Sequence, residues 1–167
     1  LDCFALRRYP EPVSQPVINA ACEVYGCQKN EVIVGNGSDD ILTILFRSFA
    51  GENDTAGSLE PSYSLYPVLS NIQGATFRKI ALADNFDLPQ DLAEQAKGCS
   101  LFFITCPNAP TANVFDQQKI KDFCRKFDGI VVIDEAYADF ADQNCLEFYK
   151  EFDNVVITRT LSKSYSL

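Results

Sequence analysis

The sequence alternates between short apolar runs and longer segments in which apolar residues recur at helical spacing. The runs are rich in valine, isoleucine, leucine and phenylalanine, which is typical of strands that are buried on both faces. We expect strands at residues 31–34, 55–60, 76–82, 101–105 and 130–133 and from residue 155 onward. We expect helices at residues 13–26, 41–49, 66–73, 88–98, 120–127 and 144–152.

The order of these elements predicts the architecture. Strands and helices alternate, and the connections are long enough to carry a helix back across a sheet, as parallel strands require. The predicted fold is therefore α/β, with three α/β/α layers around a mostly parallel central sheet. Residues 1–12 contain Pro10 and Pro12 and show no regular period, so we expect an extended N-terminal arm there and one ligand-binding domain in residues 13–167.

The charge of the chain narrows the class of partner. Its 167 residues carry a net charge of −9 without a basic cluster, which disfavours nucleic acid and anionic membrane surfaces and favours a small molecule. No apolar run approaches the roughly 20 residues of a membrane span, and the N-terminus lacks the pattern of a secretion signal. The chain contains no methionine, so we expect it to be an excerpt of a longer protein.

The seven cysteines do not form a metal-binding pattern. No two are spaced as a CxxC pair and the chain has no histidine, so we expect no metal site. Cys22, Cys99, Cys106 and Cys124 lie in or beside predicted core elements. We therefore expect mostly structural, reduced thiols, as in a cytosolic compartment.

Two strand ends carry the most informative polar residues. Asp134 directly follows the run at 130–133, and Lys163 follows the strand that begins at residue 155. Open α/β sheets bind ligands beyond the carboxyl ends of their strands. A lysine there can hold an aldehyde as a Schiff base, and a part-buried carboxylate can hold a protonated pyridine nitrogen. The alternatives are an aspartate that caps a loop or pairs with an arginine, and a lysine on the surface.

Residues 35–40 connect a predicted strand to a predicted helix through two glycines. Glycines allow a tight turn, and the free N–H groups of a helix start attract anions. Residues 35–40 are therefore a candidate phosphate cradle, with Ser38 as the expected N-cap. The alternative is an ordinary capped helix.

Two more segments follow strands and reach the same edge. Tyr63 and Tyr66 follow the strand at 55–60, where a tyrosine can stack on a flat ring or pack in the core. The turn at 106–113 contains two prolines, which forbid a continued strand and make the turn rigid.

Six motifs resemble those of the fold-type I pyridoxal-phosphate enzymes, most closely the histidinol-phosphate aminotransferases. They cover nearly the whole chain in family order. They read Arg-Tyr-Pro-Glu-Pro at 8–12, Gly-Asn-Gly-Ser-Asp-Asp at 35–40, Pro-Ser-Tyr-Ser-Leu-Tyr at 61–66, Pro-Asn-Ala-Pro-Thr at 107–111, Asp-Glu-Ala-Tyr at 134–137 and Thr-Leu-Ser-Lys at 160–163. The resemblance implies the large domain of that fold, incomplete here, and pyridoxal 5'-phosphate as cofactor.

The resemblance also implies roles for individual residues. Lys163 forms the Schiff base and moves the proton between the substrate α-carbon and the cofactor, and Asp134 pairs with the pyridine nitrogen. Tyr137 contacts the phenolic oxygen and Tyr63 stacks on the ring. The phosphate is held by Gly37, Ser38, Asp39 and Ser162, and by Tyr9 on the arm, which reaches the neighbouring subunit's cofactor in a homodimer.

The turn after residue 106 departs from the family pattern. The family's Asn-Pro-Thr-Gly reads Ala-Pro-Thr-Ala at 109–112. Ala109 cannot donate to the phenolic oxygen, so either Tyr137 makes that contact alone or Asn108 shifts to help. A lost hydrogen bond to a charged oxygen costs about 1.5–3 kcal/mol. Ala112 in place of glycine makes a left-handed backbone less favourable there.

The implied activity is amino transfer between L-histidinol phosphate and 2-oxoglutarate in histidine biosynthesis, through a pyridoxamine intermediate. Family members continue beyond the lysine with an arginine that binds the cofactor phosphate and a small domain that binds substrate, and we expect both to lie outside this chain. Two alternatives on the same fold are an aromatic-amino-acid aminotransferase and a phosphothreonine-type decarboxylase. An alternative of another class is a non-catalytic dimerisation or regulatory protein.

Overall fold

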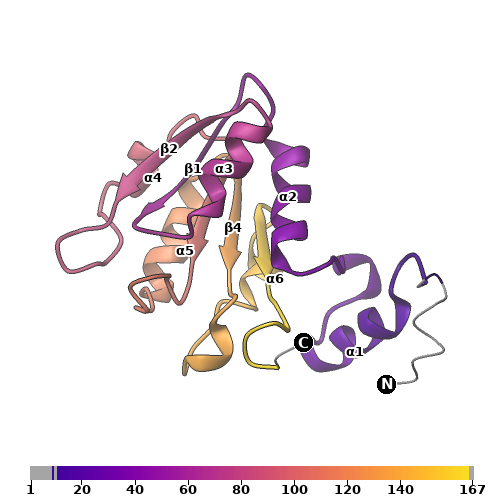
Figure 1. Ribbon diagram of the computed structural model, residues 1–167. Helices are drawn as coiled ribbons and strands as arrows, with labels where there is room; N and C mark the ends of the chain where they lie inside the picture. Colours follow the sequence, from indigo (N-terminus) through magenta and orange to yellow (C-terminus); the bar gives the residue numbers. More distant parts are fainter. Residues whose placement is uncertain (1–8, 10, 166–167) are drawn as a thin grey trace. The chain divides into compact units, whose positions relative to one another are not determined.

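The computed structural model describes residue 9 and residues 11–165 (Figure 1). By their internal contacts the residues group into two compact units, Leu1–Asn36 and Gly37–Leu167. Most of the predicted arm, residues 1–8 and residue 10, lies outside the described residues.

The first unit is built around helix α1, Gln15–Tyr25. Gly26 ends the helix in the left-handed region at φ 67°, and its N–H donates to the carbonyl of Cys22. A glycine does this without a steric penalty, so the predicted helix and its C-terminal stop are both confirmed.

The strand predicted at 31–34 is wrong. The 3-10 helix η2, Lys29–Glu31, occupies its start, and Val32 is extended at φ −123° and ψ 132°. No strand in the described part of the chain pairs with this segment. Ile33 is 73% exposed, so the apolar run lacks both the ladder and the burial that a strand requires.

The second unit contains a sheet of five strands in the order β2-β1-β3-β4-β5. The strands are β1 Thr55–Glu60, β2 Thr76–Ala81, β3 Leu101–Thr105, β4 Ile130–Asp134 and β5 Val155–Thr158. All four neighbouring pairs are parallel, as predicted. Consequently the strands all deliver their carboxyl ends to the same edge.

Six helical segments accompany these strands, the first before β1 and the other five between strands. They are α2 Ser38–Phe49, α3 Leu65–Ile72, α4 Leu92–Gln95, α5 Gln117–Lys126, η3 Ala138–Phe140 and α6 Phe148–Glu151. The helices predicted at 88–98 and 144–152 are shorter than expected. In both segments a single α-helical turn adjoins 3-10-type hydrogen bonds, which span three residues. Examples are the bonds from Lys97 N–H to the carbonyl of Glu94 and from Lys150 N–H to the carbonyl of Glu147.

Helices cover both faces of the sheet (Figure 1). On one face Phe46 of α2 and Tyr66 of α3 pack with Phe103 of β3. On the other, Phe102 of the same strand packs with Phe123 of α5. Successive residues of β3 therefore point to opposite cores, as the strand pleat dictates, and the three-layer prediction is confirmed.

Gly129, just before β4, gives a prediction about stability. A Cβ there would lie 2.6 Å from the carbonyl oxygen of Ser100 and 2.7 Å from that of Cys99. Both are backbone atoms, so Gly129→Ala should lower the free energy of unfolding by about 1–3 kcal/mol. Gly51→Ala is the matched control, because its Cβ would come no closer than 3.6 Å to Asp54 Oδ2. Urea unfolding measures both variants, and equal losses would contradict the steric argument.

Candidate active site

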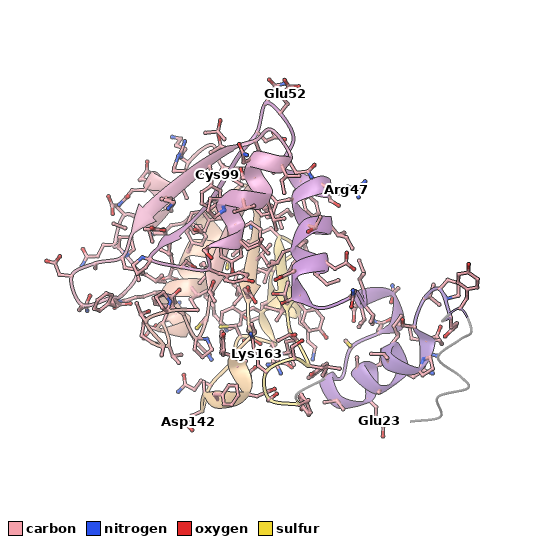
Figure 2. The ribbon with its side chains drawn as sticks, in the orientation of Figure 1. Glu23, Arg47, Glu52, Cys99, Asp142 and Lys163 are labelled. Atoms are coloured by element: carbon pink, nitrogen blue, oxygen red, sulfur yellow. The ribbon has the colours of Figure 1, made fainter. Side chains whose placement is uncertain are left out.

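The candidate site lies at the carboxyl edge of the sheet. Figure 2 shows Lys163 at the opposite end of the sheet from Glu52 and Cys99, which precede β1 and β3. At this edge Thr105, Asp134 and Thr158 are register partners on three adjacent strands. All three are buried.

Asp134 is the most buried of the predicted catalytic groups, with 3% exposure. Its Oδ2 accepts a hydrogen bond of 2.7 Å from the Tyr66 hydroxyl. Its Oδ1 accepts bonds of 3.0 Å from Thr158 Oγ1 and 3.2 Å from the backbone N–H of Ala136. Burial raises the pKa of Asp134, although these three donors favour the ionised form.

The residue that pairs with an arginine is the next one, Glu135, and not Asp134. Arg159 donates from Nε at 2.9 Å and from Nη2 at 2.7 Å to Glu135 Oε2. Glu135 also accepts from the backbone N–H of Cys145. This pair, in which Glu135 is buried and Arg159 is half-buried, links the loop after β4 to the loop after β5, and those loops carry Tyr137 and Lys163.

Lys163 and Tyr137 come together although they follow different strands. Lys163 Nζ lies 5.5 Å from the centroid of the Tyr137 ring. Tyr137 is half-buried and Lys163 is exposed. The two residues therefore stand at the edge where the buried carboxylate of Asp134 also lies.

Tyr63 connects the start of α2 to this edge. Its hydroxyl donates to Asp39 Oδ1 at 3.1 Å, and its ring meets the ring of Tyr66 edge-on at 5.6 Å. Burial raises the pKa of Tyr63, and the charge of Asp39 adds to the effect. Tyr66 is fully buried whereas Tyr63 is 37% exposed, so only Tyr63 offers a ring face to a ligand.

The predicted phosphate cradle lies at the start of α2, but the predicted N-cap is wrong. Gly37, not Ser38, is the N-cap, at φ 83°, and Ser38 is the first helical residue. A positive φ suits glycine, which explains why the cap falls there. Asp39 and Asp40 occupy the first turn, whose free N–H groups are donors of the kind that attract anions.

Asn108 is held inside the turn at 106–113. It is 2% exposed, and its amide nitrogen donates to the carbonyl of Pro61 at 3.0 Å and to Thr111 Oγ1 at 2.7 Å. Both amide hydrogens are thus in use. Its Oδ1 is buried without a hydrogen-bond partner among the residues described.

The expectation for Ala112 is wrong. The residue adopts φ 59°, the left-handed conformation that glycine favours. Such a conformation costs an alanine about 1–2 kcal/mol. Two backbone bonds hold the turn: Ala112 N–H donates to Asn108 at 2.7 Å, and Asn108 N–H donates to Asn113 at 2.9 Å.

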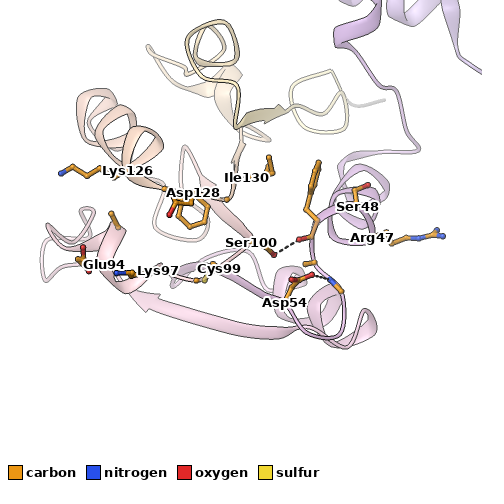
Figure 3. Close-up of a pocket in the computed structure, with 17 residues that line it drawn as sticks. Arg47, Ser48, Asp54, Glu94, Lys97, Cys99, Ser100, Lys126, Asp128 and Ile130 are labelled. Atoms are coloured by element: carbon orange, nitrogen blue, oxygen red, sulfur yellow. Dashed lines mark hydrogen bonds between the residues drawn. The ribbon is translucent and has the colours of Figure 1, made fainter.

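Two hollows lie at opposite ends of the sheet. One, of about 1040 Å³, is at the carboxyl edge and is lined by Asn108, Ala109 and Tyr137 among others. The other, of about 800 Å³, lies at the amino ends of the strands and is lined in part by Arg47 and Lys126 (Figure 3). Only the first contains predicted site residues.

The remaining predicted residues have no described contact with these groups. Ser162 is exposed, and its N–H donates to Thr160 Oγ1 at 3.2 Å. Tyr9 is fully exposed and belongs to the first unit, so its role stays a prediction.

The six cysteines among the described residues are free, and four are buried: Cys99, Cys106, Cys124 and Cys145. Within the same part of the chain, no three histidine, cysteine, aspartate or glutamate residues are grouped to hold a metal ion. No helix there has the length and apolarity to cross a membrane.

Sequence reasoning missed the residues that support Asp134, namely Tyr66, Thr105 and Thr158. A usable signal was present. Each of β3, β4 and β5 ends in a polar residue after an apolar run, and those three residues become register partners.

The fold and this edge define a class, the α/β proteins that bind ligands beyond the carboxyl ends of a parallel sheet. The chain belongs to the aminotransferase class I and II family, whose profile matches residues 1–167.

Two similar curated proteins carry the same name. The chain is 44% identical over 162 residues to the histidinol-phosphate aminotransferase of Citrifermentans bemidjiense, covering 97% of this chain and 46% of that protein. It is 45% identical over 163 residues to that of Synechocystis sp., with the same coverage of 97% and 46%. The chain therefore spans about half the length of the curated relatives it matches.

Solved structures share the fold. Histidinol-phosphate aminotransferase from Sinorhizobium meliloti, in complex with pyridoxal-5'-phosphate, matches with a TM-score of 0.90 at 19% identity, over 99% of this chain and 47% of that one. L-threonine-O-3-phosphate decarboxylase from Porphyromonas gingivalis matches with a TM-score of 0.83 at 18% identity, over 96% and 51%. At such identities the likeness concerns the fold alone.

Proposed function

We propose that the full-length protein transfers an amino group between L-histidinol phosphate and 2-oxoglutarate, with pyridoxal phosphate as cofactor. The observation that carries the proposal is sequence identity of 44–45% over 97% of this chain to proteins named histidinol-phosphate aminotransferase. The decarboxylase shares only the fold, at 18% identity.

The residues at the carboxyl edge fit this cofactor. The ring nitrogen needs an anion, and Asp134 is a buried carboxylate. Its described neighbours donate hydrogen bonds to it, and none of them forms an ion pair with it. The flat ring needs an aromatic face, and Tyr63 offers one. The phosphate needs N–H donors, and the start of α2 at Gly37, Ser38 and Asp39 supplies them.

Pyridoxal phosphate, when bound, supplies an aldehyde that accepts the amino group and a ring that takes up electron density. Lys163 holds the aldehyde and moves a proton at the substrate α-carbon. Tyr137 donates to the phenolic oxygen, and this matters more here because Ala109 has no side-chain donor. Asp134 keeps the ring nitrogen protonated.

The partners follow from the same proposal. An amino donor and a 2-oxo acid bind in turn, and two copies of the protein form a homodimer in which Tyr9 of one subunit serves the cofactor phosphate of the other. The protein works in the cytoplasm, in histidine biosynthesis.

The test is a substrate comparison on the full-length protein with added pyridoxal phosphate. We expect glutamate to form from L-histidinol phosphate and 2-oxoglutarate faster than from phenylalanine or tyrosine as donor. Faster reaction with an aromatic amino acid would replace the proposed substrate. Release of carbon dioxide from phosphothreonine without transamination would favour the decarboxylase, and absence of every activity together with no cofactor absorbance would favour a non-catalytic protein.

A further inference from the structure

The hydrogen bonds from the described residues leave the carboxylate of Asp134 one acceptor position. Two carboxylate oxygens offer about four lone-pair sites. Thr158 and Ala136 take two on Oδ1, whereas Tyr66 takes one on Oδ2. The free position is therefore on Oδ2, the oxygen that already accepts from Tyr66.

A chain of hydroxyls fixes the direction of the bond from Tyr66. An ionised Asp134 can only accept, so Tyr66 must donate its single proton to Oδ2. Thr105 Oγ1 lies 2.7 Å from the Tyr66 hydroxyl and must then donate to it. Ser62 Oγ, 3.0 Å from Thr105 Oγ1, is the next donor in the chain. Burial raises the pKa of Tyr66 well above its usual value, so the hydroxyl keeps its proton.

The aromatic core sets the position of that hydroxyl. The ring of Tyr66 stacks on Phe103 with centroids 4.5 Å apart and an interplanar angle of 17°. Phe103 in turn stacks on Phe46 at 4.9 Å and 18°. Tyr66 has no exposed surface, so its hydroxyl is placed by core packing.

We propose that Tyr66 is a positioning residue that makes Asp134 a weaker base than it would be without the hydroxyl, and leaves one lone pair of Oδ2 for the ring nitrogen of the cofactor. The assignment of that nitrogen to Asp134 rests on the proposed function. The three accepted hydrogen bonds oppose the effect of burial and favour the ionised carboxylate. The proton therefore stays on the ring nitrogen, where it makes the ring a stronger electron sink.

The test compares Tyr66→Phe with the wild type in the full-length protein. The substitution removes the hydroxyl and keeps the ring that packs on Phe103. In the cofactor-free protein, carbon-13 NMR of the Asp134 carboxyl should show a higher pKa in the variant. In the loaded protein, nitrogen-15 NMR of labelled pyridoxal phosphate should show a less protonated ring nitrogen. We expect kcat to fall about 10- to 100-fold, with KM little changed.

Two further variants complete the design. Tyr149→Phe removes the hydroxyl of a half-buried tyrosine on α6 and should leave all three measurements unchanged. Thr105→Val leaves Tyr66 intact and removes its donor, so it should shift the same three measurements in the same direction by a smaller amount. It also decides the question if Tyr66→Phe fails to fold.

The outcomes separate the two proposals. An unchanged Asp134 pKa, or an unchanged nitrogen signal and kcat, in Tyr66→Phe and in Thr105→Val would overturn the inference while the proposed function stands. A wild type that binds no pyridoxal phosphate would end the proposed function. In that case the measurement of the Asp134 pKa in the cofactor-free protein still tests whether Tyr66 controls this carboxylate.

Discussion

Replacing Lys163 with alanine should abolish the absorbance band that pyridoxal phosphate acquires when an amine of the protein binds its aldehyde, and should slow amino transfer about 10²- to 10⁴-fold. Alanine has no amine, so it can neither hold the aldehyde nor carry a proton to the α-carbon. Spectra of the full-length variant and the rate of glutamate formation measure the two effects.

Lys126→Ala is the matched control. Lys126 is also exposed, but it lines the hollow at the amino ends of the strands (Figure 3). The same chemical change there should leave the band and the rate at their wild-type values. A normal band in Lys163→Ala would show that another amine holds the cofactor, and the assignment of the site would then be wrong.

Asp134→Asn should produce the second largest loss, about a hundredfold or more in kcat. An asparagine in the same position keeps an oxygen for Thr158 and Ala136, and its amide can donate to Tyr66. The packing therefore survives, but the negative charge that would keep the ring nitrogen protonated is gone. Activity measured beside cofactor affinity tests this, and a variant that retains wild-type kcat would show that the ring nitrogen is not bound by Asp134.

The same substitution should change how stability depends on pH. Burial raises the pKa of Asp134 in the folded protein above its unfolded value of about 3.9. At pH values between the unfolded and the folded pKa, the folded state therefore binds more protons than the unfolded state. The contribution of this group to the free energy of unfolding is present below that interval and is lost as pH rises through it. Asp134→Asn removes this loss, so the cofactor-free variant should lose less stability than the wild type between pH 4 and pH 7.

Urea unfolding at the two pH values measures this difference, with Asp153→Asn, at an exposed position, as the control. The control should follow the wild type. A steeper pH dependence in Asp134→Asn than in the wild type would mean that hydrogen bonding outweighs burial at this carboxyl.

The parallel sheet could be predicted from the sequence because both faces of its strands are buried. A run such as 101–105, buried at every position, has no other common explanation when glycines and prolines bound it. The run at 31–34 shows the limit of this reasoning. Apolar side chains predict a strand only if a neighbouring strand completes the ladder, and the sequence does not show which strands are neighbours.

Part of the candidate site could also be predicted. Asp134 and Lys163 were recognisable because each follows a strand, and ligands gather at such ends. Thr158 carried the same signal, but its contact with Asp134 depends on strand order and register, and the contact of Tyr66 depends on how α3 packs on the sheet. The preference of glycine for a left-handed backbone gave the wrong expectation for Ala112, since two backbone hydrogen bonds hold the turn against that preference.

The pair between Glu135 and Arg159 has a consequence for interpreting variants. Glu135 is buried, and removing its partner would leave an uncompensated charge, which costs about 3–5 kcal/mol. A loss of that size is a large share of the stability of a typical domain. Substitutions at Arg159 found in natural populations or in screens should therefore act first by reducing how much protein accumulates in the cell, and abundance has to be measured before any effect on turnover is assigned to them.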